Sequence, residues 1–365
     1  HFQEVMYANQ RNPVAMADSC IRFIQENKEH PFFLYFCTSD PHRSGPVNDQ
    51  PMAPDAFGNT MGGHEGVEET YFTTEEVIVP PYLPESQECR EELAQYYQSV
   101  ARIDQGVAKL VQILKEADLY DKTMIVFTSD HGMAFSGGKT TVFEPGLRVP
   151  FVVRNPYEEN RGVRSTAMIS HIDITPSLLD FAGGLDSKTN GPKKWVDPDK
   201  FWKERDENLK ENRNGGHKFR SYHGKSWIPI LGDADASHWE TIFASHTFHE
   251  IQMYYPMRVV RDKEYKLIWN IAHGLPYPFA SDLWKASSWQ AQYQKGMTAP
   301  YGQKTVGDYI HRSQFELYHI AEDPHESENL AGKTEYAEIL KNYQAKLKSF
   351  QKEMDDPWIM KWDYE

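Results

Sequence analysis

Short, continuous apolar runs constrain the fold of this chain more than any other feature. Residues 32–37 and 124–128 are apolar at almost every position, and residues 149–153 form a third run of this kind. Such a run, bounded by polar loops, is typical of a strand that is buried on both faces of a sheet. Between the first two runs, apolar residues from 93 to 114 recur every three or four positions, which predicts a long amphipathic helix. Strands that alternate with helices predict a layered α/β protein.

The N-terminal two-thirds of the chain contains further helical and irregular segments. Residues 13–27 and 172–181 have helical spacing, and Pro13 stands where a first helical turn accepts proline. Residues 44–85 and 186–216 are rich in Gly, Pro and charge without a stable period, so we expect loops there.

The pattern changes near residue 240. Residues 257–261 and 265–270 flank a polar triplet, which is typical of a β-hairpin, and residues 315–320 predict another strand. Residues 336–350 have the spacing of an amphipathic helix. We therefore expect a mixed sheet flanked by helices in a domain over residues 1–240, and a smaller antiparallel α+β subdomain over residues 241–365.

Composition excludes several classes of function. The 365 residues contain 53 Asp and Glu against 39 Lys and Arg, for a net charge of −14. An acidic surface repels phosphate backbones and anionic lipids, so we expect no nucleic-acid or membrane partner. No apolar run approaches the length of a membrane span. The three cysteines have no spacing that indicates a disulfide framework or a zinc site.

Polar side chains follow two of the predicted strands. Asp130 and His131 come directly after residues 124–128, and a carboxylate beside an imidazole at a strand end suits a metal ion. They are equally compatible with a capping Asp and a surface His. Asp40, His42 and Arg43 follow residues 32–37 and offer an acceptor, a proton donor and an anion clamp, although Pro41 is also typical of an ordinary turn.

Two further groups of residues are candidates for binding. Lys139 follows Gly137 and Gly138, and glycines allow a backbone to approach a ligand closely, although a lysine in such a loop is often only solvated. His249 and Glu250 follow a strand-like segment and could bind sugar hydroxyls or an amine, or could simply be polar residues at the end of a strand.

Taken together, these segments resemble the sulfatase family of the alkaline phosphatase superfamily. The resemblance rests on five motifs in the family's order, which cover nearly the whole chain: residues 31–42 (PFFLYFCTSDPH), 128–132 (TSDHG), 143–150 (FEPGLRVP), 172–179 (IDITPSLL) and 323–330 (DPHESENL). Within the family, the chain is most similar to the heparan N-sulfatase branch, on residues 40–43, 102–106, 249–250, 255–258 and 356–358.

The resemblance implies an alkaline-phosphatase-like fold and a mechanism. In this family a cysteine in a C-x-P-S-R segment is oxidised to formylglycine, and a divalent cation, usually Ca²⁺, holds the nucleophile and a sulfate oxygen. Asp130 and His131 would be metal ligands. His42 would contact the sulfate or protonate the leaving group, and Lys139 would neutralise sulfate oxygens. The residues implied to bind the sugar and its sulfate are Asp40, Arg43, His249 and Glu250.

The sequence departs from the family in two ways. No cysteine lies in a C-x-P-S-R segment, and the paired aspartates of the family's first strand are absent, so we expect both in an N-terminal portion outside this sequence. His131 stands where many sulfatases carry Asn, and imidazole suits Mn²⁺ or Zn²⁺ better than Ca²⁺. Two alternatives therefore stay open: a phosphodiesterase or phosphonate monoester hydrolase of the same superfamily, and a non-catalytic glycan-binding fragment.

Expectations about partners and location follow from the implied substrate. We expect a sulfated saccharide of the heparan type, consistent with a role in glycosaminoglycan degradation, and we expect the N-terminal segment to complete the site; a homodimer stays open. Sulfated glycans lie outside the cytoplasm, and the chain has no Asn-x-Ser/Thr sequon. A periplasmic or extracellular bacterial location is therefore favoured over a lysosomal one, with the signal segment outside this sequence.

Overall fold

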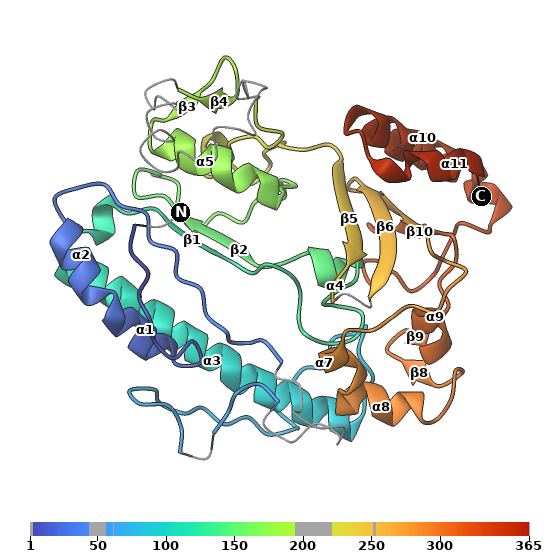
Figure 1. The fold of residues 1–365 in the computed structure, drawn as a ribbon, viewed down its shortest axis with the longest axis horizontal. Coiled ribbons are helices and arrows are strands. Elements are labelled where there is room, and N and C mark those ends of the chain that lie inside the picture. The colour runs from blue at the N-terminus through green and yellow to red at the C-terminus, as the bar shows by residue number, and fades with distance from the viewer. Residues whose placement is uncertain (1–2, 44–55, 61, 194–220, 251–252, 365) are drawn as a thin grey trace, which may run out of the picture. The chain divides into compact units, whose positions relative to one another are not determined.

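The computed structural model describes residues 3–43, 56–60, 62–193, 221–250 and 253–364 (Figure 1). These residues form two compact units, one of residues 1–156 together with 243–365, and one of residues 157–242. The predicted C-terminal subdomain thus groups with the N-terminal residues, and the predicted domain boundary at 240 stays a prediction. Each unit is described by itself below.

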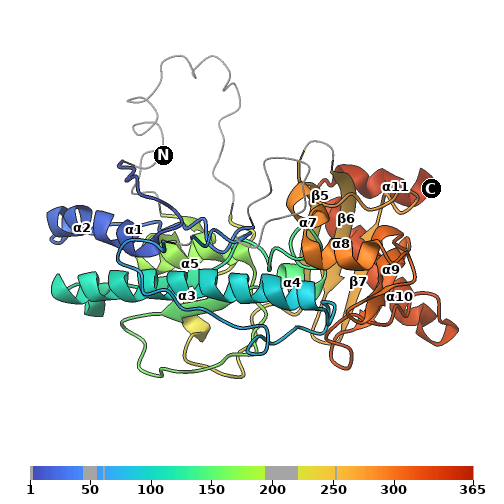
Figure 2. The same cartoon turned by 90° about the horizontal axis from the view of Figure 1, so that it is seen from below.

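The helices of the N-terminal part are those that the spacing predicts. The predicted helix over residues 13–27 is present as α1 (Pro13–Ser19) and α2 (Ile21–Asn27), which are separated at Cys20. The long amphipathic helix is α3 (Gln87–Glu116), capped by the Ser86 side chain. Helix α1 lies along α3 (Figure 2), and Gly106 permits this contact because a Cβ there would lie 2.2 Å from Cβ of Pro13.

The predicted doubly buried strands are only partly confirmed. Residues 125–128 and 151–154 do form strands, β1 (Ile125–Thr128) and β2 (Phe151–Arg154), which pair antiparallel. Both are half-exposed, with Phe127 39% and Val152 62% accessible, so the prediction of burial on both faces was wrong. Residues 32–37 form no strand, so the prediction of a buried strand over these residues was wrong. The side chains of Phe33 and Tyr35 in this segment are exposed.

The C-terminal residues of the first unit form a four-stranded sheet with the order β10-β7-β6-β5. Figure 1 labels β5, β6 and β10 of this sheet. Its strands are β5 (Ile242–Phe248), β6 (Tyr254–Arg261), β7 (Tyr265–Asn270) and β10 (Phe315–His319). The predicted hairpin is confirmed as β6 and β7, whose turn is held by Oδ1 of Asp262 accepting from the backbone N–H groups of Glu264 and Tyr265. The predicted final helix is α10 (Ala337–Glu353), which packs on the apolar side chains of β6 and β7.

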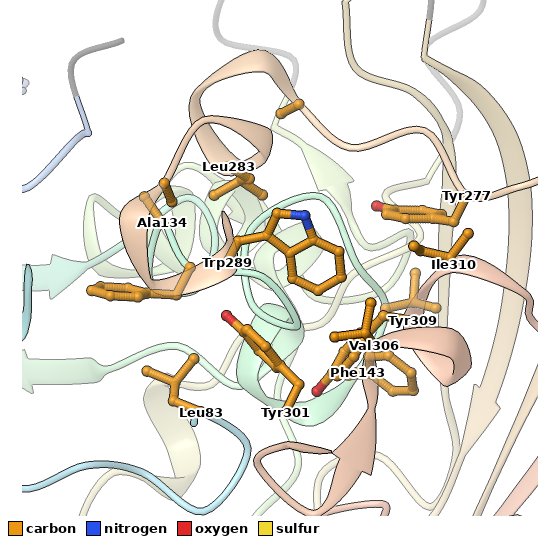
Figure 3. Close-up of a cluster of buried hydrophobic side chains, with 14 of the residues drawn as sticks. Leu83, Ala134, Phe143, Tyr277, Leu283, Trp289, Tyr301, Val306, Tyr309 and Ile310 are labelled. Atoms are coloured by element: carbon orange, nitrogen blue, oxygen red, sulfur yellow. The ribbon is translucent and has the colours of Figure 1, made fainter. Parts of the chain in front are cut away.

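Short elements surround the main apolar core of this unit, in which Trp289 is central (Figure 3). Trp289 is fully buried among Leu283, Tyr301 and Tyr309. The elements of this part are α4 (Glu144–Leu147), α7 (Ser281–Trp284), α8 (Ser287–Tyr293), β8 (Pro300–Tyr301), β9 (Lys304–Thr305) and α9 (Val306–Ile310). At the C-terminus, α11 (Lys361–Tyr364) instead packs through Trp362 on the apolar cluster of β6, β7 and α10.

The second unit contains the predicted helix over residues 172–181 as α5 (Ile174–Phe181) and a hairpin of β3 (Leu185–Asp186) and β4 (Gly191–Pro192). Its centre is Asp173, whose buried carboxylate accepts hydrogen bonds from the backbone of Ser170 and Lys225 and from Trp239 Nε1. None of the helices in the described residues has both the length and the apolar character that crossing a membrane requires. Helices with antiparallel sheets confirm the α/β class.

Candidate functional site

Three side chains from distant parts of the sequence meet in the first unit. The Nζ atom of Lys139 lies 3.1 Å from Nε2 of His42 and donates to Oδ2 of Asp282 at 2.8 Å. Lys139 is 3% exposed and Asp282 is 6% exposed, whereas His42 is exposed. We call these three residues the Lys139 cluster. It joins two residues that the sequence predicts as catalytic with one that it does not predict.

A compact loop holds Lys139 in place. Its backbone N–H donates to the carbonyl of Met133 at 2.9 Å, and the hydroxyl of Tyr277 donates to the carbonyl of Thr140 at 2.6 Å. The loop begins at Gly132, where a Cβ would lie 1.7 Å from the carbonyl oxygen of Pro145. Glycine is therefore required for the two ends of the loop to come together, and this closure places Lys139 beside His42.

Two arginines, the partly exposed Arg11 and the buried Arg102, hold the turn that carries His42. Arg11 donates through Nη1 to the carbonyl of His42 at 2.8 Å and to Oδ1 of Asp40 at 2.9 Å. Arg102 donates through Nε to Oδ2 of Asp40 at 3.0 Å. Asp40 is buried, and both of its carboxylate oxygens accept from arginine. Asp40 thus positions His42, whereas its predicted contact with the sugar stays a prediction.

Asp282 reaches the cluster from helix α7. The next residue, Leu283, is fully buried in the core around Trp289 (Figure 3), which anchors this short helix. Sequence reasoning did not identify Asp282, because a single Asp in the segment Ala280-Ser281-Asp282 has no pattern that separates it from a helix-capping residue. Only the packing of α7 against the loop of Lys139 makes it part of the site.

Arg43 has a different environment from the one that the sequence predicts. Its guanidinium is 0% exposed and donates to both carboxylate oxygens of Glu92, at 2.7 and 3.1 Å. It also lies over the rings of Phe57 and Phe135, at 4.6 and 4.7 Å from the centroids. Glu92 in turn accepts from the Ser287 side chain at 2.9 Å. These contacts make Arg43 a residue that joins α3, α8 and the loop of residue 134, rather than an exposed anion clamp.

Of the other two predicted sugar-binding residues, Glu250 contacts helix α7. Oε1 of Glu250 accepts from the hydroxyl of Ser281 at 2.9 Å, which brings Glu250 next to the helix that carries Asp282. His249 is half-buried, and its charge contributes to lowering the pKa of His246, after the larger effect of burial. Their predicted contact with a sugar stays a prediction.

Asp130 and His131 have donor atoms that fit a metal ion. Nδ1 of His131 lies 2.8 Å from the carbonyl of Gly132, which can only accept, so Nδ1 carries the proton and Nε2 keeps its lone pair. Nε2 lies 3.7 Å from Oδ2 of Asp130, a separation that one ion with bonds of about 2.0–2.5 Å can span. The Asp130 side chain is 85% exposed. Within the described residues no group of three His, Cys, Asp or Glu side chains is placed to hold a metal, so a complete site needs further ligands.

The electrostatics of the cluster favour a neutral His42. Burial, and after it the charge of Lys139, lowers the pKa of His42 below its ordinary 6.5. The Asp282 charge acts in the opposite direction, and the Arg11 and His131 charges add smaller lowering effects. The effect of His131 also shows that the two predicted groups, residues 40–43 and 130–131, lie near each other in the fold.

Comparison with known proteins identifies the family. The model of the family described as Sulfatase matches residues 7–184. N-sulphoglucosamine sulphohydrolase of Homo sapiens is 31% identical over 347 residues, which are 93% of this chain and 64% of that protein. An ulvan-active sulfatase of Formosa agariphila is 25% identical over 88% of this chain and 52% of its own length. The chain thus spans less than two-thirds of the length of these relatives.

Solved structures show the same fold. A protein in complex with its substrate D-glucosamine-2-N,6-O-disulfate superposes with a TM-score of 0.53 at 18% identity, over 97% of this chain and 71% of that one. The predicted alkaline-phosphatase-like architecture is therefore confirmed at the level of the fold. On these comparisons the chain contains a domain of the sulfatase family, matched over residues 7–184.

Proposed function

We propose that the protein that contains this chain is a sulfatase that removes sulfate from a sulfated glycan, with N-sulfoglucosamine of the heparan type as its favoured substrate. The observation that carries the proposal is the Lys139 cluster, in which a buried ammonium group lies beside an imidazole. The 31% identity with a human N-sulphoglucosamine sulphohydrolase over 93% of this chain supports the choice of substrate.

The cluster offers the two functions that sulfate transfer requires of side chains. Lys139 presents an ammonium group with little access to water, where its attraction to an anionic sulfate oxygen is stronger than in bulk solvent. His42 is exposed and has a lowered pKa, so its imidazole is unprotonated at neutral pH and can take part in proton transfer by accepting a proton. The neutral imidazole and the charged ammonium thereby divide proton transfer and charge neutralisation between them.

The remaining parts of the site are proposed from the family resemblance. Asp130 and Nε2 of His131 would hold a divalent cation, Ca²⁺ or alternatively Mn²⁺ or Zn²⁺. The bound cation would supply Lewis acidity toward a sulfate oxygen. The formylglycine nucleophile and the further metal ligands would come from an N-terminal segment outside this sequence.

The surrounding residues then take two kinds of role. We place Glu250 and His249 at the sugar, because Glu250 contacts the helix that carries Asp282. Arg43 and Asp40 are buried and support the turn around His42 through their ion pairs. A location outside the cytoplasm, where sulfated glycans are found, belongs to the same proposal.

The proposal is tested by product analysis. A protein that comprises this chain and the N-terminal segment is incubated with N-sulfoglucosamine, glucosamine 6-sulfate, a phosphodiester and a phosphonate monoester, and released anions are quantified by ion chromatography. We expect sulfate from N-sulfoglucosamine at the highest kcat/KM. Release of phosphate or phosphonate products alone would instead establish a phosphodiesterase or phosphonate hydrolase. Binding of sulfated glucosamine without release of any anion would establish a glycan-binding protein.

A further inference from the structure

Asp282 is the charged residue of the Lys139 cluster to which the sequence and the family resemblance assign no role. Its Oδ2 accepts from Nζ of Lys139 at 2.8 Å, and it is nine-tenths buried. Its other oxygen, Oδ1, is also buried and accepts no hydrogen bond from the described residues. Lys139 is therefore the group that compensates the buried charge of Asp282, and the two side chains depend on each other.

The hydrogen-bond roles at His42 follow from this pairing. A lysine that is paired with a carboxylate is an ammonium group, which can donate hydrogen bonds but cannot accept them. Nε2 of His42 lies 3.1 Å from that ammonium, so Nε2 must be the acceptor and must carry no proton. The imidazole is then neutral, with its proton on Nδ1.

We propose that Asp282 is a positioning residue of this site: through Oδ2 it holds the Lys139 ammonium against Nε2 of His42 and thereby fixes the imidazole in the neutral form with the proton on Nδ1. The catalytic use of this positioning rests on the proposed function, whereas the hydrogen-bonded arrangement of Asp282, Lys139 and His42 does not depend on it. A substrate sulfate that draws Lys139 toward itself would leave the Nε2 lone pair free to accept a proton from solvent water, and the imidazole could then pass that proton to the leaving group, so one movement of the lysine would couple charge neutralisation to proton transfer.

Four charged groups act on His42, and each must be considered in a test. Lys139, Arg11 and His131 carry or can carry positive charge, whereas Asp282 carries the negative charge that faces the imidazole. Removing the Asp282 charge alone therefore shifts the pKa of His42 in a direction that depends on where Lys139 moves. The tautomer is the clearer readout, because it reports directly whether Lys139 still donates to Nε2.

The experiment is a ¹⁵N–¹H correlation of the histidine rings in the 365-residue chain, at a pH where His42 is neutral. The His42 signals are assigned from their loss in His42→Gln. We expect His42 in the wild type to be protonated on Nδ1. In Asp282→Asn the ammonium loses its carboxylate partner, and we expect His42 to shift toward protonation on Nε2; Lys139→Met removes the donor and should give the same shift.

A matched control separates positioning from general destabilisation. Asp356→Asn also removes a partly buried carboxylate, one that is paired with Arg258 through contacts of 2.5 and 3.1 Å, and we expect it to leave the His42 tautomer unchanged. A wild-type His42 protonated on Nε2, or an unchanged tautomer in both Asp282→Asn and Lys139→Met, would overturn the proposal. Because the readout needs no turnover, a chain that shows the expected tautomers but whose longer form releases no sulfate would contradict the proposed function alone.

Discussion

Replacing Arg43 distinguishes a structural residue from a substrate-binding one. Arg43→Met keeps most of the apolar stem of the side chain and removes the guanidinium. The structure then loses two hydrogen bonds to Glu92, at 2.7 and 3.1 Å, and one from Nε to the carbonyl of Ala134 at 2.9 Å. It also loses the cation–π contacts with two phenylalanines.

The expected loss in the free energy of unfolding follows from the Glu92 carboxylate that Arg43→Met leaves without its ion-pair partner. Glu92 would stay buried with serine donors but without a cation, and breaking a buried ion pair on one side costs about 3–5 kcal/mol in the free energy of unfolding. Such a loss is a large share of the total of about 5–15 kcal/mol that is typical of a domain. The double variant Arg43→Met/Glu92→Met removes both charges, so we expect it to be more stable than Arg43→Met alone.

The pH dependence gives the same interpretation a second test. Burial acts to raise the pKa of Glu92, but the charge and hydrogen bonds of Arg43 outweigh burial and hold this pKa below its ordinary 4.5. Without Arg43, burial dominates and the pKa of Glu92 rises above its ordinary value. The carboxylate of the variant then becomes protonated in the fold as the pH falls, and we expect its stability deficit to be larger at pH 7 than at pH 5.

The assay is urea denaturation followed by tryptophan fluorescence and circular dichroism. The expected result for Arg43→Met is a lower urea midpoint with an unchanged slope. Arg22→Met is the control, because Arg22 pairs with Glu26 on the surface and its side chain is 66% exposed; a loss below about 1 kcal/mol is expected there. A loss of this small size for Arg43→Met, together with weaker binding of a sulfated sugar, would refute the structural interpretation.

Three more predictions follow from the same kind of reasoning. Lys266→Met should cost about 3–5 kcal/mol in a denaturation experiment, because the buried Lys266 is 3.2 Å from Glu144 and 2.7 Å from Glu326; a loss below 1 kcal/mol would contradict this. The lowered pKa of His42 should make the free energy of unfolding rise with pH from that pKa up to 6.5, and His42→Gln should flatten the curve there. Asp130→Asn in the longer protein should weaken cation binding at least tenfold by calorimetry, with an unchanged melting temperature of the metal-free form; unchanged affinity would remove Asp130 from the ligands.

The sequence predicts local structure well where a segment's own pattern decides it. Helix α3 has one apolar stripe, and the hairpin of β6 and β7 has a polar turn, so neither depends on distant residues for its identity. The apolar run over residues 32–37 is different, because an extended segment becomes a strand only when another backbone accepts its hydrogen bonds. The structure assigns no strand to these residues, and the side chains of Phe33 and Tyr35 are exposed.

The candidate site was predictable only in part, because motifs identify single residues but not which of them meet in the fold. His42 and Lys139 were found through motifs, but their meeting depends on a loop closure between residues 97 positions apart. Asp282 could not be found, because its role exists only once α7 packs beside that loop. Motif residues can also be structural: Glu144 and Glu326 belong to two of the family motifs, and both lie on the buried ammonium of Lys266.

The kinetic effect of removing Lys139 tests the central claim most directly. In the protein that includes the N-terminal segment, sulfate release from N-sulfoglucosamine is measured for the wild type, Lys139→Met and the surface control Lys333→Met, each with its melting temperature. We expect Lys139→Met to lose about 10²–10³-fold in kcat, as for loss of one donor to a developing anion, whereas Lys333→Met should be unchanged. A folded Lys139→Met enzyme with wild-type kcat and kcat/KM would contradict the assignment of the Lys139 cluster as the sulfate-transferring site.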